Sequence, residues 1–466
     1  MTFAQTIKSR LNSFLYWIFS LPTASVLILT QGISVVFWWI AGSYFGLDIF
    51  YSRSFSGDDS WCDPLTQGMG VHCWGDYYSL TQAFTLNSES PYLGPYKTSY
   101  GPAGLLFVQF FHWVGEVSSQ PRLGLILYMI LMITTIGWSV WKASFGVNIE
   151  KRLVLFSALT FFAPPVIMAL DRGNTVAFLL PLMIWYFESL VRGKYRQVAV
   201  AIVVMSVIKP HFAVLVLALF IFGRIIIGAK AALAAASLNL LPFVFLWGSE
   251  FYVYVNQWLL VFFGYQAYQD PENPFPTNIS FSHSIIRLSS GVNDLKIVDL
   301  SSVVSGFQDN SGIFGFIVGV FVLLMILLFR KIMTQIQISI LIISCVSLMS
   351  GTTYLYYAVF AIPNLLILNR IKPGATEESS FAIERFSKHI NRNINFVLWL
   401  ASVGTLVQLP IFDSVQDTWV ITTSSMIGGV WISAYLVIAA ILTVHALQHR
   451  NLSTSTKGYL ALHQEN

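Results

Sequence analysis

Two cysteines, two tryptophans and two aspartates are gathered in the stretch WCDPLTQGMGVHCWGDYY, residues 61–78. A carboxylate can take a proton from a hydroxyl group, which is the task of a general base. Asp76 is our first candidate for this task. Asp58, Asp59 and Asp63 lie in the same part of the chain and are alternative candidates. Another explanation for Asp76 is that it caps the N-terminus of a helix.

The rest of the chain is strongly apolar. Hydrophobic residues make up 55% of the 466 residues and charged residues only 10%, and the mean hydropathy is +0.67. Segments long enough to cross a hydrocarbon layer about 30 Å thick recur along nearly the whole chain. The apolar run near the N-terminus has no clear small-residue cleavage site, so we interpret it as a retained span. The sequence predicts an all-α polytopic membrane protein in which residues 1–466 form a single integral membrane domain. No nucleic acid is expected among its partners.

The topology follows from the basic residues, which are retained on the cytoplasmic side of a membrane. A twelve-span arrangement with both termini cytoplasmic places 19 of the 26 basic residues inside and 16 of the 22 acidic residues outside. The apolar segments 101–117 and 251–269 then lie against the outer surface, because crossing would carry later basic clusters outside. The predicted spans are residues 22–44, 121–141, 153–169, 174–191, 197–208, 211–223, 229–247, 311–329, 334–350, 353–369, 394–411 and 418–446.

Four segments remain outside these spans. Two large outer regions cover residues 45–120, which include Asp76, and residues 248–310. The cytoplasmic side receives a loop at 371–393, which we interpret as a surface helix, and a tail at 447–466. The segments with room for chemistry therefore face outward.

Two of the predicted spans, 197–208 and 211–223, are too short to cross separately, because twelve helical residues extend only about 18 Å. They meet in the sequence IKPHF, where Pro210 interrupts the helix by removing a backbone donor. We interpret the pair as a hairpin with Lys209 at its apex. A lysine at membrane depth costs about 2.5 to 3.5 kcal/mol on insertion scales, so such a residue is a candidate for function. The alternative is a lysine that snorkels from a misplaced helix end.

The sequence after Asp76 resembles the first outer loop of the GT-C superfamily of membrane glycosyltransferases. The resemblance is specifically to glycosyltransferase family 87, the polyprenyl-phosphate-mannose-dependent mannosyltransferases. In that family an aspartate opens a surface helix, followed by a Gly/Pro-Tyr element and a Tyr-Pro-Pro turn. These features fall on Asp76, Tyr78, Ala83, Pro91 with Tyr92, and Tyr100 to Pro102, with Gly101 in place of the first proline of the turn.

Three later segments resemble further elements of the family, in the family's order. They are LDRGNTVAFLLPL, VVMSVIKPHFAVLVL and NISFSHSIIRL. The resemblance covers roughly residues 45–368. It implies a GT-C-like bundle of about 12 transmembrane helices, two of them short and forming a hairpin, with outward-facing juxtamembrane helices.

The implied activity is inverting transfer of a sugar from a polyprenyl-phosphate donor to a lipid or glycan acceptor at the outer face of the plasma membrane. Mannose is the usual sugar of the family. Asp76 would be the general base, and Lys209, Arg172 and Arg287 would bind the donor phosphate. Substrate contacts would come from Tyr78, Tyr100, Asn174, His211, Asn278 and His283, and the aromatic side chains of Trp74 and Tyr77 could stack on the sugar. Membrane lipids are expected partners.

Two other classes of function compete with this hypothesis. A lipid-linked glycan flippase or transporter should have two related halves and polar residues near the midplane of the membrane. This chain has unequal loops and polar residues clustered toward the outside. A glycan polymerase or ligase would need similar cations for lipid-phosphate chemistry and is harder to separate by sequence. No CxxC pair, HExxH motif or histidine-rich cluster suggests a structural metal site. No cofactor is predicted, and dependence on a divalent metal stays open.

We predict a disulfide between Cys62 and Cys73, which lie eleven residues apart in the first outer loop. An oxidising compartment permits the bond, and it would fasten the loop directly before Asp76. Cys345 lies in an apolar span, where a small core residue is expected, and it serves as the free-thiol control. Peptide mapping by mass spectrometry without reduction should recover Cys62 and Cys73 as one linked pair. Recovery of both as free thiols from quenched native membranes would refute the bond.

Overall fold

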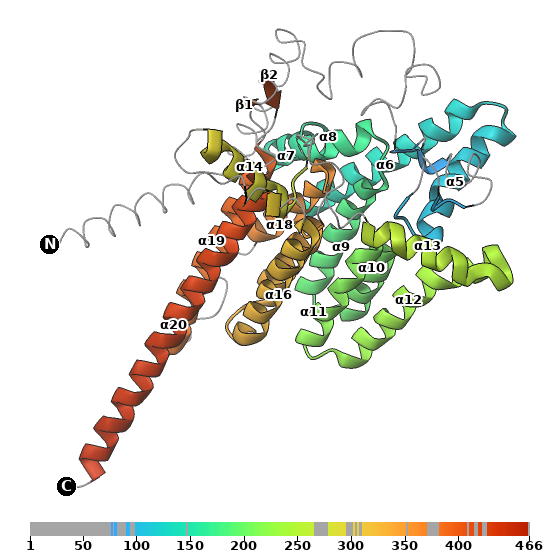
Figure 1. The fold of residues 1–466 in the computed structure, drawn as a ribbon. Coiled ribbons are helices and arrows are strands. Elements are labelled where there is room, and N and C mark those ends of the chain that lie inside the picture. Colours follow the sequence, from blue (N-terminus) through green and yellow to red (C-terminus); the bar gives the residue numbers. More distant parts are fainter. Residues whose placement is uncertain are drawn as a thin grey trace.

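The structure is a computed structural model of the 466-residue chain. It describes residues 76–77, 79–81, 90–93, 98–145, 148–264, 278–294, 302, 305–306, 310–350, 353–370, 382–407, 410–413, 418–421 and 426–464. These residues are helical apart from connecting turns and one two-stranded antiparallel sheet. Figure 1 shows the helices gathered into a bundle, with the C-terminal helix extending beyond it. The predicted helical class is therefore confirmed.

Helices α5 (Pro102–Val117) and α6 (Pro121–Ala143) form a tightly packed pair. Each begins with a proline, whose missing N–H has no helical partner at that position in any case. The turn between them contains Ser119, which has a positive φ of 56°. A Cβ on Gly124 would collide with the carbonyl oxygen of Phe111, so the two backbones touch directly. The sequence correctly separates a helix at 101–117 from the span that follows it.

The next span is broken. Helices α7 (Ile149–Phe161) and α8 (Pro164–Asp171) meet at an angle of 50°. Two consecutive prolines at the start of α8 explain the break, because proline cannot continue the hydrogen bonds of the preceding helix. The short 3-10 helix η1 (Thr175–Phe178) and helix α9 (Leu179–Val191) follow α8.

The predicted pair of short helices around Lys209 is present. Helix α10 (Tyr195–Ile208) ends directly before Lys209, and the 3-10 helix η2 (Pro210–Leu215) and helix α11 (Val216–Ile221) follow it. Lys209 has an extended backbone, with φ −141° and ψ 109°. The proline that follows it disfavours the helical conformation at this position. The break in the helix is thus encoded locally.

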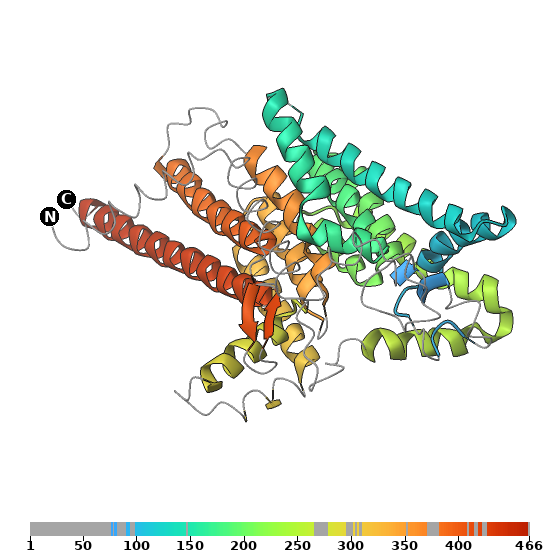
Figure 2. The same cartoon turned by 90° about the horizontal axis from the view of Figure 1, so that it is seen from above.

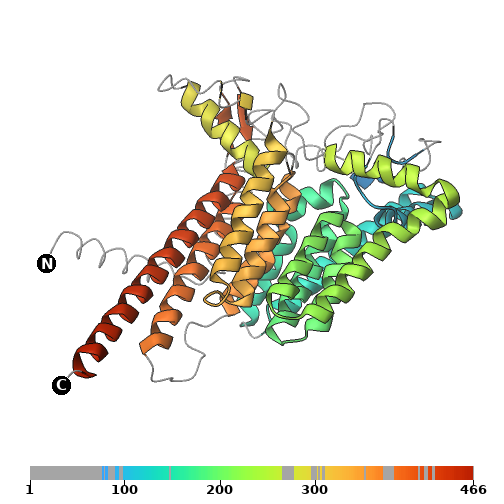
Figure 3. The ribbon, with the colours of Figure 1, turned by 60° about the horizontal axis from the view of Figure 1, so that its bottom comes forward.

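The chain turns sharply between α12 (Ile225–Trp247) and α13 (Phe251–Gly264). Gly248 lies at this turn with φ 52°, a value that glycine adopts without strain. Figure 3 shows the two helices running in different directions. By length and composition alone, residues 225–262 form one 38-residue candidate span. The bend at Gly248 divides this segment into α12 and α13.

Helix α13 holds the first outer region in place. The Ser90 hydroxyl donates to the side chain of Gln257 at 2.6 Å, and the Trp258 indole N–H donates to the Ser99 carbonyl at 3.0 Å. These bonds connect residues far apart in sequence. They fix the segment that leads into α5.

The C-terminal half is built around α17, which is buried from Gln337 to Leu348. Thr334 and Gln337 form a capping box at its start. Figure 2 shows α19 and α20 running side by side, away from the α5–α6 pair. The elements of this half are α14 (Phe281–Asp294), α16 (Ser311–Phe329), α17 (Gln335–Leu348), η4 (Leu355–Phe360), α18 (Ala361–Arg370), α19 (Ala382–Leu406) and α20 (Ile427–Gln464).

The predicted spans 394–411 and 418–446 were wrong where the first one ends and the second one begins. The strands β1 (Pro410–Asp413) and β2 (Thr418–Ile421) pair antiparallel there. Short apolar runs rich in β-branched and aromatic residues fit a strand as well as a helix, and apolarity alone does not separate the two. Helix α19 also begins at Ala382, so the second half of the predicted loop at 371–393 is helical and continuous with the span.

Several helices are apolar enough to identify a membrane protein. Within the described residues four helices are long enough to cross alone, and the bent pair α7–α8 would make a fifth span. The four candidates are Arg122–Ala143, Ile225–Phe262, Gly312–Phe329 and Ile427–Gln448. The twelve-span topology stays a prediction, and its first span, at 22–44, lies outside the described residues.

Candidate active site

A cavity of about 700 Å³ lies where the N-terminal and C-terminal halves meet. Its lining comes from the segments before α5, the end of α8, η2, α13, α16, α17 and the segment around η4. Polar lining residues include Asp76, Tyr100, Arg172, Asn174, Lys209, His211, Tyr354, Tyr356 and Tyr357, and apolar ones include Val214, Phe262, Phe316, Val346 and Met349.

The end of α8 presents two of these side chains. Gly173 has φ 60° and follows the last helical turn. The N–H of Asn174 donates to the carbonyl of Ala169 at 2.8 Å, and the N–H of Gly173 donates to that of Leu170 at 3.0 Å. This is a Schellman motif, in which glycine supplies the left-handed residue. The sequence Arg-Gly-Asn therefore ends the helix and turns Arg172 and Asn174 toward the cavity.

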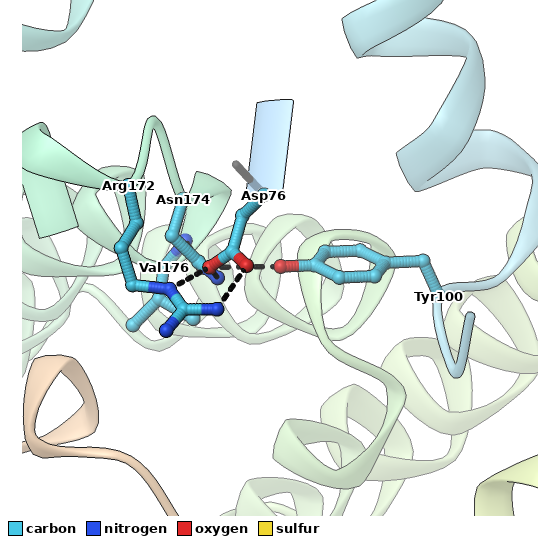
Figure 4. A network of polar contacts seen from close by, with 5 residues as sticks. All are labelled: Asp76, Tyr100, Arg172, Asn174 and Val176. Atoms are coloured by element: carbon cyan, nitrogen blue, oxygen red, sulfur yellow. Dashed lines mark hydrogen bonds and ion pairs between the residues drawn. The ribbon is translucent and has the colours of Figure 1, made fainter. Parts of the chain in front are cut away.

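Asp76 is held by both of these residues (Figure 4). The Arg172 guanidinium donates from Nη2 to Asp76 Oδ1 at 2.6 Å and from Nε to Oδ2 at 2.8 Å. The Asn174 amide donates to Oδ2 at 2.6 Å. Such bidentate, charge-assisted bonds are among the strongest side-chain contacts in proteins. The Arg172 and Asp76 side chains are 15% and 18% exposed, so the pair lies at the cavity wall and is not sealed in the core.

The orientation of Asn174 is fixed by its own partners. Its side-chain oxygen accepts from the backbone N–H of Val176 at 2.9 Å, so it caps η1. The same oxygen accepts from the Tyr100 hydroxyl at 3.0 Å. With its oxygen occupied in this way, the amide must present its NH₂ group to Asp76.

The backbone around Asp76 is anchored as well. The N–H groups of Asp76 and Tyr77 donate to the Arg172 carbonyl at 3.0 and 3.3 Å. From α5, the Gln109 side chain donates to the carbonyls of Leu80 and Thr81 at 2.9 and 2.8 Å. The short helical segment that carries Asp76 is therefore docked on both α8 and α5.

The environment of Asp76 keeps its carboxylate ionised. Burial raises the pKa of the carboxyl group, but the charge of Arg172, the hydrogen bonds from Arg172 and Asn174 and the charge of Lys209 lower it. The net pKa lies below the ordinary value of 3.8. Asp76 is thus a stable anion that is a weak base while Arg172 holds it.

Lys209 is the second cation of the site. Its side chain is buried, with 6% exposure, and its Nζ lies 3.5 Å from the centroid of the Tyr100 ring and 5.7 Å from that of Tyr357. The His211 ring packs against that of Tyr357 in a tilted arrangement, with the ring centroids 5.6 Å apart. In the part of the chain that the structure describes, no carboxylate forms an ion pair with Lys209. An aromatic face compensates a buried charge only in part, so this ammonium group is suited to receive an anion.

Three tyrosines at the cavity were missed by the sequence analysis. Tyr354, Tyr356 and Tyr357 lie in or next to η4. The Arg172 guanidinium carbon lies 5.2 Å from the Tyr354 ring centroid and 5.8 Å from that of Tyr356. The cluster GTTYLYY at the start of a span was a usable signal. Aromatic residues are common near membrane surfaces for reasons unrelated to a substrate, so this cluster does not stand out in the sequence.

The structure brings six of the predicted site residues together. Asp76, Tyr100, Arg172, Asn174, Lys209 and His211 all line the cavity. Three others, Arg287, Asn278 and His283, are not among the lining residues. Tyr78, Cys62, Cys73 and Trp74 lie outside the described residues, as do the rival aspartates Asp58, Asp59 and Asp63.

Asn278 and Tyr77 contact other parts of the protein and do not line the cavity. The Asn278 side-chain oxygen accepts from the N–H groups of Ser280 and Thr353 at 3.1 and 3.0 Å, and Asn278 pairs with Tyr354 in an isolated β-bridge. It therefore supports the segment that carries the tyrosines. Tyr77 is buried against Tyr128 at a ring distance of 5.0 Å and is not among the lining residues of the cavity.

The site contains one described carboxylate and has no set of metal ligands. Across the described ranges, no group of three histidine, cysteine, aspartate or glutamate side chains could hold a metal ion.

The fold and the site define a multi-pass membrane protein with a paired carboxylate and two cations at one cavity. Comparison with protein families identifies the class more closely: the model of glycosyltransferase family 87 matches residues 98–351. The match covers more than half of the chain, so the chain belongs to this family and is a glycosyltransferase. The matched range is narrower than the predicted 45–368, and Asp76 precedes it. Comparison with curated protein sequences gives no match.

The pKa of Asp76 predicts a pH-dependent stability. Because the folded pKa lies below the unfolded value of 3.8, ionised Asp76 stabilises the fold above pH 3.8, and this contribution is lost as the pH falls through the lowered folded pKa. The difference in Tm between the wild type and Asp76→Asn should therefore be constant above about pH 5 and shrink at lower pH. Thermal unfolding in detergent measures it. Exposed Glu116 supplies the control Glu116→Gln. A Tm difference unchanged down to pH 3 would contradict the prediction.

Proposed function

We propose that this family 87 glycosyltransferase moves a sugar, with mannose as the first candidate, from a polyprenyl-phosphate donor to a lipid or glycan acceptor. The reaction would take place at the outer face of the plasma membrane. The observation that carries the proposal is the meeting of one carboxylate and two cations in a cavity that is also lined by apolar side chains.

The chemistry is a single displacement. The acceptor oxygen forms a bond to the anomeric carbon, and its proton moves to the Asp76 carboxylate. The bond between the anomeric carbon and the phosphate oxygen breaks, and its electron pair leaves with the lipid phosphate. One displacement inverts the anomeric configuration. The lipid phosphate is already a good leaving group, so the protein needs to position the reactants and activate the acceptor.

The cations suit the donor phosphate. Arg172 offers a planar fork of N–H donors that matches a phosphate in geometry, whereas Lys209 offers a compact charge. Both side chains line the cavity with Asp76. Within the described residues Lys209 has aromatic rings as its side-chain neighbours, so an anion would supply the charge partner that its burial calls for.

The cavity lining suits an amphiphile. Phe262 of α13 and Phe316 of α16 line the cavity, and Phe316 is 62% exposed. A lipid chain can lie along these apolar side chains while its phosphate reaches the cations and its sugar reaches the tyrosines. Aromatic faces are common partners of apolar sugar faces, and Tyr354 and Tyr356 lie beside Arg172.

A flippase and a polymerase or ligase remain the competing functions. A flippase moves its lipid without breaking a bond, so it needs no base, whereas membership of family 87 supports a transferase. The decisive experiment incubates purified protein with a panel of polyprenyl-phosphate sugars and a lipid-extract acceptor. Transfer of one sugar with release of polyprenyl phosphate supports the proposal. Movement of lipid without release of phosphate would support the flippase instead.

Asp76→Asn should reduce turnover by roughly the 10²- to 10⁴-fold typical of a general base, because an amide cannot take the acceptor's proton. Donor binding should persist. Single-turnover transfer with saturating donor measures the loss. Asp58→Asn, Asp59→Asn and Asp63→Asn are the controls and should cost less. A folded Asp76→Asn enzyme with most of its turnover would move the base role to one of those three aspartates.

Lys209→Ala should impair binding and turnover of the donor far more than it lowers thermal stability, because the substitution removes a cation that binds the donor phosphate. The readouts are KM for the donor, turnover and thermal stability in detergent. Lys142→Ala is a matched control, since Lys142 lies outside the cavity at the end of α6. Near wild-type KM and turnover in Lys209→Ala would refute the phosphate role of Lys209.

A further inference from the structure

We propose that Asp76 and the donor phosphate compete for the same two cations, Arg172 and Lys209, so that donor binding is the event that makes Asp76 an effective base. This inference rests on the proposed function and adds an order to it. The donor enters first and takes over part of the cationic charge. The acceptor hydroxyl is activated second.

The bonding of the carboxylate is the first observation. Asp76 accepts three charge-assisted or amide hydrogen bonds, two from Arg172 and one from Asn174. A carboxylate has about four acceptor positions, so three are occupied. With both oxygens held by a guanidinium and its pKa lowered, Asp76 has little tendency to take a proton from a hydroxyl group.

The free edge of Arg172 is the second observation. Its guanidinium carries five N–H donors, and the bonds to Asp76 use only Nε and Nη2. No hydrogen-bond partner of Nη1 lies among the residues that the structure describes. An anion in the cavity can therefore bind the Nη1 and Nη2 edge of the guanidinium and replace part of its hydrogen bonding to Asp76.

The aromatic support of Arg172 is the third observation. Tyr354 and Tyr356 face the guanidinium with their rings, and neither ring contact uses an N–H donor. The side chain can thus exchange one oxygen partner for another without leaving its place. Arg172 differs here from an arginine whose position depends on its salt bridge alone.

The electrostatic coupling between Asp76 and a bound phosphate follows from the groups that surround Asp76. The groups that face Asp76 are Arg172 and Asn174 from the end of α8, Lys209 from before η2, Tyr100 from before α5, Tyr128 from α6, and Tyr354 and Tyr356 from around η4. The two cations in this set are the proposed phosphate ligands. A bound phosphate cancels part of their field at Asp76 and raises the basicity of the carboxylate. The coupling is reciprocal, so Arg172 and Lys209 should bind the phosphate more tightly in a protein that has a neutral residue at position 76.

The competing interpretation is a purely structural ion pair. In that case Arg172 keeps Asp76 in every state of the enzyme and fastens the first outer region to α8. Loss of the Asp76 charge would then lower stability and leave phosphate affinity equal or weaker. The two interpretations differ in the sign of one measurable effect.

The test measures binding of farnesyl phosphate, a soluble stand-in for the lipid phosphate, to purified full-length protein by calorimetry at pH 6, where Lys209 carries its charge. We expect Asp76→Asn to bind it about fivefold or more tightly than the wild type, which is the lower end of typical coupling between sites. Glu116→Gln removes an exposed carboxylate from the end of α5 and should leave the affinity unchanged. Farnesol, which has no phosphate, should bind both proteins alike.

A second measurement uses the wild type and does not depend on a folded variant. The acid limb of kcat/KM for the donor reports the free enzyme, and the acid limb of the single-turnover rate at saturating donor reports the complex. The acid limb of the donor complex should lie at higher pH than that of the free enzyme, because the bound phosphate raises the basicity of Asp76. Coincident limbs, or equal or weaker farnesyl phosphate affinity in Asp76→Asn, would overturn this inference alone. Absence of farnesyl phosphate binding in every protein would overturn the proposed phosphate site and this inference together.

Discussion

The ion pair between Asp76 and Arg172 is the contact on which the site depends. It joins the first outer region to the end of α8, two segments separated by almost a hundred residues. Its strength comes from bidentate geometry and partial removal from water, and the loss of one partner from such a pair costs about 3 to 5 kcal/mol when the pair is buried. The remaining water exposure of both side chains lowers that figure. The pair is also positioned by backbone bonds, so it does not carry the docking alone.

Helix ends supply nearly all of the polar groups of the cavity. Arg172 and Asn174 follow a Schellman motif, Lys209 precedes a proline, and Tyr354 precedes a 3-10 helix. The reason is physical: backbone that leaves the helical pattern needs partners or water, and in a membrane protein such backbone is tolerated where it lines a cavity. Breaks in apolar helices therefore bring polar side chains to one cavity.

The balance of charge at the cavity connects structure with catalysis. Two cations and one carboxylate leave a net positive site, which favours an anionic substrate and lowers the basicity of the carboxylate at the same time. A transferase that uses a phosphate leaving group can accept this arrangement, because its substrate brings the missing negative charge. Under the proposed function, the carboxylate would have little basicity until the donor phosphate is bound.

The sequence by itself determined the helical membrane class, the break at Lys209, the helix end at Gly173 and the chemistry of six lining residues. Each is a local property: apolar length, a proline, a glycine with positive φ, or a charged side chain next to an apolar run. The tertiary structure decided which polar groups meet. Only packing between distant segments places the Tyr354 segment beside Arg172, keeps Arg287 out of the cavity lining and turns Tyr77 into the core. It also replaced the facing ends of two predicted spans with a β-hairpin, because strand pairing depends on a partner that local apolarity does not specify.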